Sequence, residues 1–282
     1  MSEINIPEHV KPNNKPKFVF QQKTEVINLP SKGLCYNANN PLSGGVVEMY
    51  YPDTSHEEIL SDRKLLKKNQ TIDKFLKSLI ADNTNFNDIL LGDKSALMIA
   101  SRIMLYGKDY PIEKITCKYC EEEQPIVVDL TQIEHKEIDY SLLNSDNLYE
   151  FTLPMVKHIV KFKMLTHKDE MSVLDELKRR NDYNKKSGKK DAIDAEFTTR
   201  LKYMIKEVTY EDQTGSLVTI SEPTELKMYK MYGRDSFEFR KHLNKISPDI
   251  KNEISYICNE CDELNKIKLP MTISFFWPDT GI

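Results

Sequence analysis

Two pairs of cysteines with the spacing Cys-x-x-Cys constrain this chain more than any other feature. The four residues are Cys117 and Cys120 in the first pair, and Cys258 and Cys261 in the second. Two thiolates at this spacing on one tight turn bind a tetrahedral metal ion, and two pairs supply all four ligands. Extended, β-type runs lead into and out of each pair. The pattern predicts two zinc knuckles that face each other as a four-cysteine zinc ribbon, although residues 121–257 separate them.

Three other uses of these cysteines fit the sequence less well. Disulfides require an oxidising compartment, whereas the chain opens without a signal-peptide pattern and has an odd fifth cysteine, Cys35. A thioredoxin-like redox pair needs a helix that begins at the cysteines, whereas acidic residues, a proline and a β-type run follow Cys120. A catalytic zinc ion keeps one position open, and four thiolates leave none. We therefore expect structural Zn²⁺ at the four paired cysteines, and a half-buried Cys35 in a turn.

The composition is that of a soluble globular protein with a modest core. Of its 282 residues, 30% are charged and 39% are hydrophobic, and the net charge is −4. No apolar run reaches the roughly 20 residues that span a bilayer, so we expect no membrane association. The nine glycines form no phosphate-binding loop, and we expect no small-molecule substrate. These features indicate the cytoplasm, or a particle that assembles there.

Composition and periodicity divide the chain into four parts and predict an α+β fold. Residues 1–25 are polar and rich in proline, which predicts a flexible N-terminal arm. Residues 26–110 predict an α/β block. Residues 111–131 and 250–278 predict the split zinc ribbon, and residues 132–249 predict an inserted α+β domain with a helical hairpin. A metal that closes so long a loop stabilises the fold by removing entropy from the unfolded chain.

Apolar periodicity and capping residues locate the individual elements. In the first block we expect short strands over 26–51, then helices capped by Thr54 or Ser55 and by Thr71, and a central helix from Asp93 to Tyr106 that Gly107 ends. In the insert we expect a hairpin over 148–165 and then a helix over 167–183 that Thr166 caps. A second helix should follow, with these residues on one face: Ile193, Phe197, Leu201, Met204 and Val208. A strand pair over 208–220 and a helical segment over 224–243 should complete the insert.

Zinc ribbons commonly bind nucleic acid, so the charges near the cysteines bear on function. The two predicted turns carry six acids: Glu121, Glu122, Glu123, Glu260, Asp262 and Glu263. Lys118 is the only base inside either pair, and four thiolates with Zn²⁺ add a formal charge of −2. Such a tip repels phosphate, and we interpret the nearby Lys114, Lys266 and Lys268 as an offset to the negative charge of the site. A nucleic-acid-binding zinc-ribbon protein remains the alternative function, and salt-sensitive binding of DNA or RNA would identify it.

A basic stretch over residues 178–190 is the other candidate for nucleic acid. It holds seven positive charges and one acid, at the expected tip of the helical hairpin: Lys178, Arg179, Arg180, Lys185, Lys186, Lys189 and Lys190, with Asp182. Runs of like charge are commonly solvated faces, and aromatic residues are nearly absent here. We interpret the stretch as a solvated loop, with contact to an acidic protein neighbour as the alternative.

No group of residues predicts catalysis. The six histidines are scattered, and none stands in a His-Glu-x-x-His arrangement. We interpret His56 as part of a helix start, His158 as a partly exposed sheet residue, and the aromatic residues Tyr203, Tyr229, Tyr232, Phe237 and Phe239 as packing residues. A metal-dependent hydrolase would need an open ligand position. We therefore expect a protein that is not an enzyme.

The aromatic cluster Phe275-Phe276-Trp277-Pro278 has two open interpretations. Aromatic residues are enriched in interface cores, so the cluster can bind a partner. Equally, the rings can close the protein's own core.

Several stretches, taken in order, resemble the baseplate hub proteins of T4-like tailed bacteriophages. The resembling stretches are Leu29-Pro30-Ser31-Lys32-Gly33-Leu34, Gly45-Val46-Val47-Glu48-Met49, Glu57-Glu58-Ile59-Leu60, Leu91-Gly92-Asp93-Lys94, Tyr106-Gly107-Lys108-Asp109-Tyr110, both cysteine pairs and Ile273-Ser274-Phe275-Phe276. The likeness covers about residues 26–130 and 250–278. It implies a non-enzymatic structural or assembly role in the hub of a contractile tail baseplate. The implied partners are other baseplate hub and tail proteins, which meet in the host bacterial cytoplasm. The resemblance leaves open whether the protein stays in the virion or departs after assembly.

Overall fold

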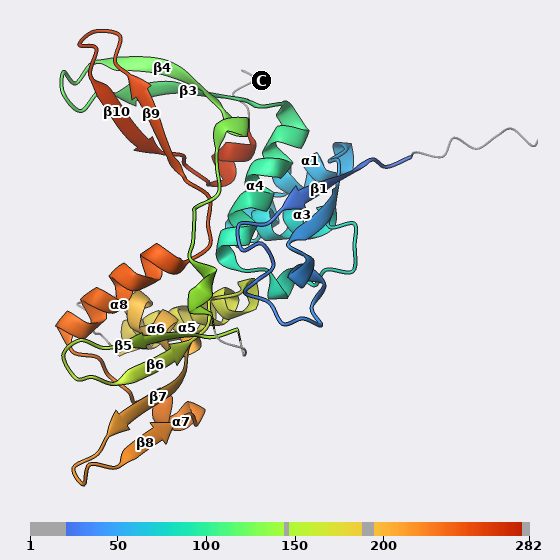
Figure 1. Ribbon diagram of the computed structural model, residues 1–282. Helices are drawn as coiled ribbons and strands as arrows, with labels where there is room; N and C mark the ends of the chain where they lie inside the picture. Colours follow the sequence, from blue (N-terminus) through green and yellow to red (C-terminus); the bar gives the residue numbers. More distant parts are fainter. Residues whose placement is uncertain (1–20, 144–146, 188–194, 278–282) are drawn as a thin grey trace, which may run out of the picture.

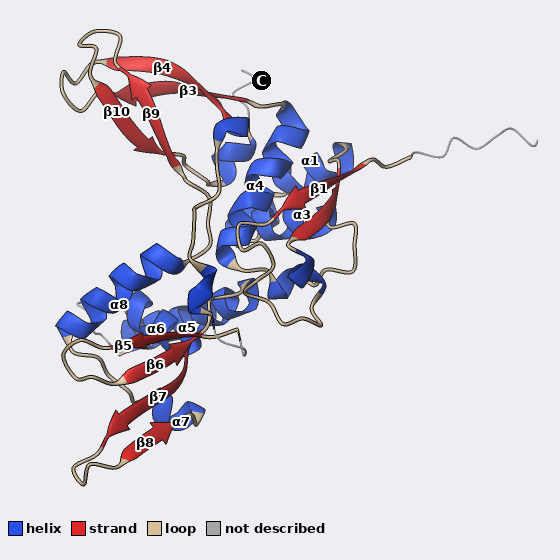
Figure 2. Cartoon of the chain, in the orientation of Figure 1, coloured by secondary structure: helices blue, strands red, loops and turns tan. Residues whose placement is uncertain are grey.

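Helices and small antiparallel sheets make this a mixed α+β protein, as the sequence predicts (Figure 2). The structure is a computed structural model that describes residues 21–143, 147–187 and 195–277. Most of the predicted N-terminal arm therefore lies outside the described residues, together with Lys189, Lys190, Ile193 and Pro278. The described sheets are three two-stranded hairpins and one sheet of four strands. Figure 1 shows the four-stranded sheet and the two hairpins that carry the cysteines at opposite ends of the molecule.

The first block packs short helices and one strand pair around a central helix. Its elements are β1 (Thr24–Asn28), β2 (Val46–Tyr50), α1 (Thr54–Ser61), α2 (Arg63–Lys67), α3 (Thr71–Leu79) and α4 (Leu91–Tyr106), with 3-10 turns at Pro41–Gly44 and Phe86–Asp88. The central helix α4 ends at Gly107, whose φ of 85° suits glycine. The fully buried side chains of this core include Leu42, Met49, Phe75, Leu76, Leu79, Leu97, Phe275 and Phe276. The chain end thus completes the core of the first block.

Two predicted helix caps in this block are wrong. Asp53 caps α1, because its carboxylate accepts hydrogen bonds from the backbone N–H and the hydroxyl of Ser55. The His56 side chain in turn contacts the Asp53 backbone N–H, which completes a capping box. Thr71 is the first residue of α3 and not its cap, and its buried hydroxyl has no partner within the described residues. An ionised carboxylate is a stronger acceptor than a hydroxyl, which favours Asp53 over Thr54 or Ser55.

A buried carboxylate joins α4 to the loop that follows β1. Asp93 is fully buried and accepts hydrogen bonds from the Ser31 backbone N–H (2.8 Å), the Ser31 hydroxyl (2.7 Å) and the Tyr36 hydroxyl (2.6 Å). Burial raises the pKa of Asp93, although these donors act in the opposite direction. The sequence places Asp93 at the start of a helix, but α4 begins two residues earlier, at Leu91.

The four-stranded sheet forms the far end of the molecule, with helices beside it. Its strands, in the order β5-β6-β7-β8, are β5 (Tyr149–Thr152), β6 (Ile159–Phe162), β7 (Ile205–Glu211) and β8 (Leu217–Ile220). The helices are α5 (His167–Lys186), α6 (Glu196–Met204), α7 (Pro223–Leu226) and α8 (Gly233–Ile246). The hairpin over 148–165 and the Thr166 cap of α5 are confirmed.

Three predicted element ends in this region are wrong. Val208 belongs to β7 and not to the preceding helix, because β-branched residues from Ile205 onward pair with β6. The expected helix over 224–243 is two helices, α7 and α8, separated by residues 227–232. Helix α5 continues to Lys186, past the predicted end at Tyr183, and so includes the first part of the basic stretch.

The four-stranded region contacts the first block through backbone groups. The Leu91 N–H donates to the Leu165 carbonyl (3.1 Å), and the His167 N–H donates to the Ile89 carbonyl (2.7 Å). Gly92 lies so close to Pro248 that a Cβ added there would stand 1.7 Å from the Pro248 carbonyl oxygen. A glycine is therefore required at this position, because any side chain would separate the two segments.

Candidate metal centre

Two β-hairpins carry the cysteine pairs at their tips. The first consists of β3 (Asp109–Thr116) and β4 (Glu123–Asp129), and the second of β9 (Glu253–Ile257) and β10 (Leu264–Lys268). Although the two hairpins are far apart in sequence, Figure 1 shows them side by side. The predicted β-type runs on both sides of each pair are thus observed.

The two tips have the same backbone hydrogen bonds. In the first, the Cys117 N–H donates to the Glu122 carbonyl, and the Glu121 N–H donates to the Cys117 carbonyl. In the second, the Cys258 N–H donates to the Glu263 carbonyl, and the Asp262 N–H donates to the Cys258 carbonyl. Glu121 and Asp262, each directly after the second cysteine of its pair, have positive φ angles of 63° and 56°. The two turns are therefore copies of one local structure.

These turns bring all four sulfur atoms together. The Sγ atoms of Cys117 and Cys261 are 3.7 Å apart, and those of Cys120 and Cys258 are 3.6 Å apart. All four lie within 4.8 Å of one another. A tetrahedral site with zinc–sulfur bonds of about 2.3 Å places its sulfurs about 3.8 Å apart, whereas a disulfide requires about 2.05 Å. The separations fit a shared metal ion and exclude a disulfide in this arrangement.

A reciprocal pair of amide side chains holds the two tips against each other. Gln124, seven residues after Cys117, accepts from the Asn259 N–H (2.8 Å) and donates to the Ile257 carbonyl (3.1 Å). Asn265, seven residues after Cys258, accepts from the Lys118 N–H (3.0 Å). Each amide thus binds the backbone directly after the first cysteine of the opposite pair. Both side chains are buried.

Asn265 also acts directly on a sulfur atom. Its Nδ2 donates to Cys117 Sγ at 3.3 Å, and the Tyr119 backbone N–H donates to the same sulfur at 3.4 Å. Donors of this kind stabilise a thiolate and orient it toward a metal. Gln124 and Asn265 were not predicted from the sequence, although each follows the first cysteine of its pair by the same seven residues.

The pKa values of Cys117 and Cys261 are shifted in opposite directions. Desolvation opposes ionisation of Cys117, but hydrogen bonds from backbone N–H groups and from Asn265 outweigh it and lower the pKa to about 6. At Cys261 a backbone hydrogen bond favours the thiolate, but desolvation and the other three cysteines raise the pKa to about 12. Negative charge on one sulfur atom opposes ionisation of the neighbouring thiols. A cation among the four sulfur atoms would remove this electrostatic repulsion.

The surface around this cluster is acidic. Five carboxylates at the tips are exposed: Glu121, Glu122, Glu260, Asp262 and Glu263. Lys114 pairs with Glu123 (3.3 Å) and Lys266 pairs with Glu253 (2.8 Å), so these lysines neutralise carboxylates on the strands. The tip keeps a negative charge that gives a phosphate backbone no attraction.

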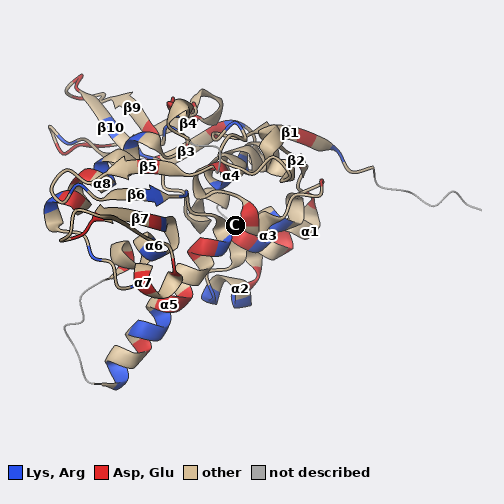
Figure 3. Cartoon of the chain, turned by 60° about the horizontal axis from the view of Figure 1, so that its bottom comes forward, with Lys and Arg blue, Asp and Glu red and all other residues tan. Residues whose placement is uncertain are grey.

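The other residues singled out in the sequence are dispersed over the molecule. The basic residues up to Lys186 lie on the exposed end of α5, which projects from the body in Figure 3. His158 precedes β6 and contacts the Tyr229 hydroxyl at 3.0 Å. Cys35 is half-buried, as expected, and burial raises its pKa to about 11.

The aromatic residues divide between core and surface. Phe275 and Phe276 are fully buried, and the Phe276 ring packs against Phe75 with centroids 5.2 Å apart. Trp277 is partly exposed, so the C-terminal cluster closes the protein's own core and leaves one ring at the surface. Of the five aromatic residues predicted to pack (Tyr203, Tyr229, Tyr232, Phe237 and Phe239), the prediction is wrong for two, because Tyr232 and Phe237 are 61% and 57% exposed.

Comparison with known proteins gives one match. The model of the family described as "T4 bacteriophage base plate protein" matches residues 42–277, which is most of the chain. No curated protein and no solved structure matches significantly. Within the described ranges, no helix has the length and apolar character needed to cross a membrane.

The family match has direct consequences for function. It implies a component of the virion tail that contacts other phage structural proteins and has a structural role. The resemblance seen in the sequence is confirmed at this level. The chain belongs to the T4 bacteriophage base plate protein family.

Proposed function

We propose that Cys117, Cys120, Cys258 and Cys261 bind one structural Zn²⁺ ion. The support is geometric, because four sulfur atoms at tetrahedral separations close the coordination sphere. Bound zinc would supply a cation that stabilises the thiolates and links the two hairpins. Gln124 and Asn265 keep the tips in register, and the Asn265 amide orients the Cys117 sulfur.

We further propose that the metal clamps a split ribbon, residues 111–131 and 250–278, around an inserted domain, residues 132–249. The connecting segments support this division, since they run antiparallel beside each other. His135 forms a bridge with Ile250, the Lys136 N–H donates to the Asp249 carbonyl, and the Lys251 N–H donates to the Glu134 carbonyl. The chain thus leaves and re-enters the ribbon region at one place, and the clamp would fix how the two ends of the molecule are oriented.

On this basis we propose a non-enzymatic structural or assembly protein of the baseplate hub, which meets its partners in the host bacterial cytoplasm. The observation that carries the proposal is the closed four-sulfur cluster between sequence-distant segments of a base plate family protein. A four-thiolate site offers no open position for substrate and suits a rigid scaffold.

The test is purification of the tagged protein from cells infected with the phage that encodes it. Metal analysis should find one zinc per chain, and mass spectrometry should identify other baseplate proteins in the same complex. Cys258→Ser should lose both, whereas Cys35→Ser, which alters the cysteine outside the cluster, should keep both. Absence of the wild-type protein from every tail complex, with normal tails in a phage that lacks it, would refute the proposed role. A zinc-free wild-type protein would refute the clamp alone.

A further inference from the structure

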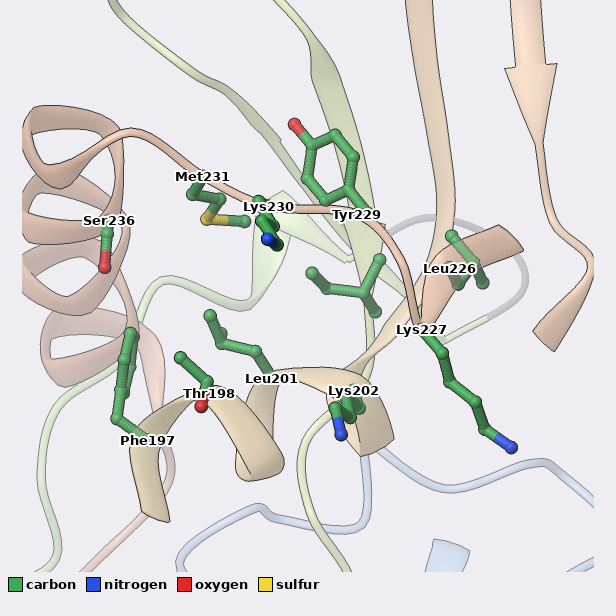
Figure 4. A pocket seen from close by; sticks show the side chains of 11 residues that line it. Phe197, Thr198, Leu201, Lys202, Leu226, Lys227, Tyr229, Lys230, Met231 and Ser236 are labelled. Atoms are coloured by element: carbon green, nitrogen blue, oxygen red, sulfur yellow. The ribbon is translucent and has the colours of Figure 1, made fainter. Parts of the chain in front are cut away.

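A cavity lies beside the four-stranded sheet, at the end of the molecule opposite the cysteine cluster. It has a volume of about 380 Å³ and opens between α6, the segment that follows α7, and the first turn of α8 (Figure 4). Its walls are mainly apolar and include Phe197, Leu201, Leu226 and Met231. The cavity therefore has room for a large apolar side chain.

The rim of this cavity is positively charged. Lys202, Lys227 and Lys230 line it, and the Arg240 guanidinium lies 4.9 Å from the centre of the Phe197 ring. Lys202 pairs with Glu176 at 2.7 Å, and Lys227 also lowers the pKa of that carboxyl group. Within the described part of the chain, Lys227 and Lys230 form no ion pair of their own, and both are exposed. The rim thus keeps an excess of positive charge.

Three exposed large apolar side chains are next in sequence to residues that line the cavity. Met228 is 81% exposed, Tyr232 is 61% exposed, and Phe237 in α8 is 57% exposed. Met, aromatic residues and Arg are the types enriched in protein interfaces. A folded protein rarely leaves such residues together at its surface without a binding role.

We propose that this surface, formed by the cavity and residues 227–237, docks an acidic segment of a partner protein that inserts one apolar side chain. The cavity would bury the anchor, and the rim lysines would attract the carboxylates on either side of it. Nucleic acid fits less well, because the cations encircle an apolar cavity and do not follow a track for successive phosphates. The proposal does not depend on the metal centre, which lies at the other end of the molecule.

The experiment uses the full-length protein as purified and three pools of fluorescein-labelled 12-residue peptides. The first pool has Leu, Phe or Trp at the centre, flanked by Asp and Glu. The second replaces the acids with Lys and Arg, and the third replaces the central residues with Ser. Fluorescence anisotropy should detect binding of the first pool only, and this binding should weaken as salt rises.

Two variants locate the binding. Lys227→Glu with Lys230→Glu should weaken binding by about tenfold or more, since attraction becomes repulsion. Ser236→Phe should block the anchor by filling the cavity. Lys64→Glu with Lys67→Glu is the matched control, because it makes the same charge change on the exposed surface of α2. It should bind like wild type, and circular dichroism should show every variant folded.

Different results would identify other occupants and overturn the proposal. Equal binding of all three pools would show that the surface is not selective. Wild-type binding by both variants would show that the peptides bind elsewhere on the protein. Tighter binding of single-stranded DNA than of the acidic pool would assign the surface to nucleic acid. The protein could instead self-associate in a concentration-dependent way that Lys227→Glu with Lys230→Glu abolishes. That result would assign the surface to the acidic cysteine tip of a second copy.

Discussion

The two cysteine-bearing hairpins and the helical first block are stabilised in different ways. In the block, Phe75, Leu97 and Phe276 are buried completely around α4. In the hairpins, three large apolar residues are each more than 60% exposed: Tyr119, Val127 and Ile257. Polar and sulfur contacts join the two hairpins: the cluster, the two amides, and the Tyr256 hydroxyl that donates to the Thr116 carbonyl. Four short strands cannot enclose a large core, and the metal ion that we propose for the cluster would replace one.

The largest expected effect comes from removing a metal ligand. Cys258→Ser should abolish zinc binding, and structural zinc sites contribute about 10–16 kcal/mol of binding free energy in small peptides. The hairpins should then become sensitive to protease and exchange their amide hydrogens rapidly. The block should keep its protection, because its core residues lie outside the four-cysteine cluster. Hydrogen exchange with mass spectrometry would measure both regions at once.

Cys35→Ser is the matched control for this variant. It removes the fifth thiol, which contacts Tyr149 and lies outside the cluster. Zinc content and hairpin protection should remain at wild-type levels. If Cys258→Ser leaves the hairpins as protected as before, the contrast between the two regions is wrong.

The converse experiment removes a core ring from the block. Phe276→Ala should lower the free energy of unfolding of the block by about 3–5 kcal/mol, because it leaves a cavity against Phe75. Zinc content should not change. Chemical denaturation followed by helical circular dichroism would give the first value, and metal analysis the second.

Trp277→Ala provides the comparison for that change. Trp277 is the next aromatic residue along the chain but is 44% exposed, so its loss should cost far less than the loss of Phe276. Equal costs for the two variants would show that the chain end does not complete the core.

An intermediate effect should follow from the amides that join the tips. Asn265→Ala removes the amide that donates to the Cys117 sulfur and accepts from the Lys118 backbone N–H. It should therefore weaken zinc affinity by about 10–100-fold. Gln124→Ala should act in the same direction, because it leaves the Asn259 N–H without its partner. Competition with a chelator of known affinity would measure both.

Asn259→Ala tests whether the side chain or the backbone matters at that tip. The Asn259 backbone N–H remains in this variant and still reaches Gln124, so zinc affinity should equal that of wild type. A loss comparable to that of Gln124→Ala would mean that the reciprocal contact has been assigned to the wrong groups.

The same contrast explains what could be predicted from the sequence. The cysteine spacing alone led to the four-sulfur cluster, because two residues on one turn have few possible arrangements. The central helix and its end at Gly107 followed from local periodicity and from the conformational freedom of glycine. The amides Gln124 and Asn265 were missed because their partners are 135 and 147 residues away in the chain. Val208 was assigned to a helix because its apolar spacing suits both structures, and pairing with β6 decided between them.

The smallest expected effect, and one confined to the block, concerns the cap of α1. Hydrogen bonds from Ser55 lower the pKa of Asp53 to about 2, against desolvation, and His56 acts in the same direction. Because this folded-state pKa lies below the ordinary value of 3.8, the cap stabilises the protein above that value. The contribution is then lost as the pH falls toward 2. Asp53→Ala should therefore cost about 1 kcal/mol at neutral pH, and progressively less in acid.

Urea denaturation of wild type and Asp53→Ala, followed by helical circular dichroism over that pH range, measures this difference. Glu58→Ala is the control, because it removes an exposed carboxylate from the same helix that is not the cap. It should show little difference from wild type at any pH. Acid also protonates the thiols of the cluster and releases a bound metal, but that change is common to all three proteins and cancels in the comparison. A cost for Asp53→Ala that stays constant or grows as the pH falls would show that the carboxylate of Asp53 does not stabilise the block through its charge.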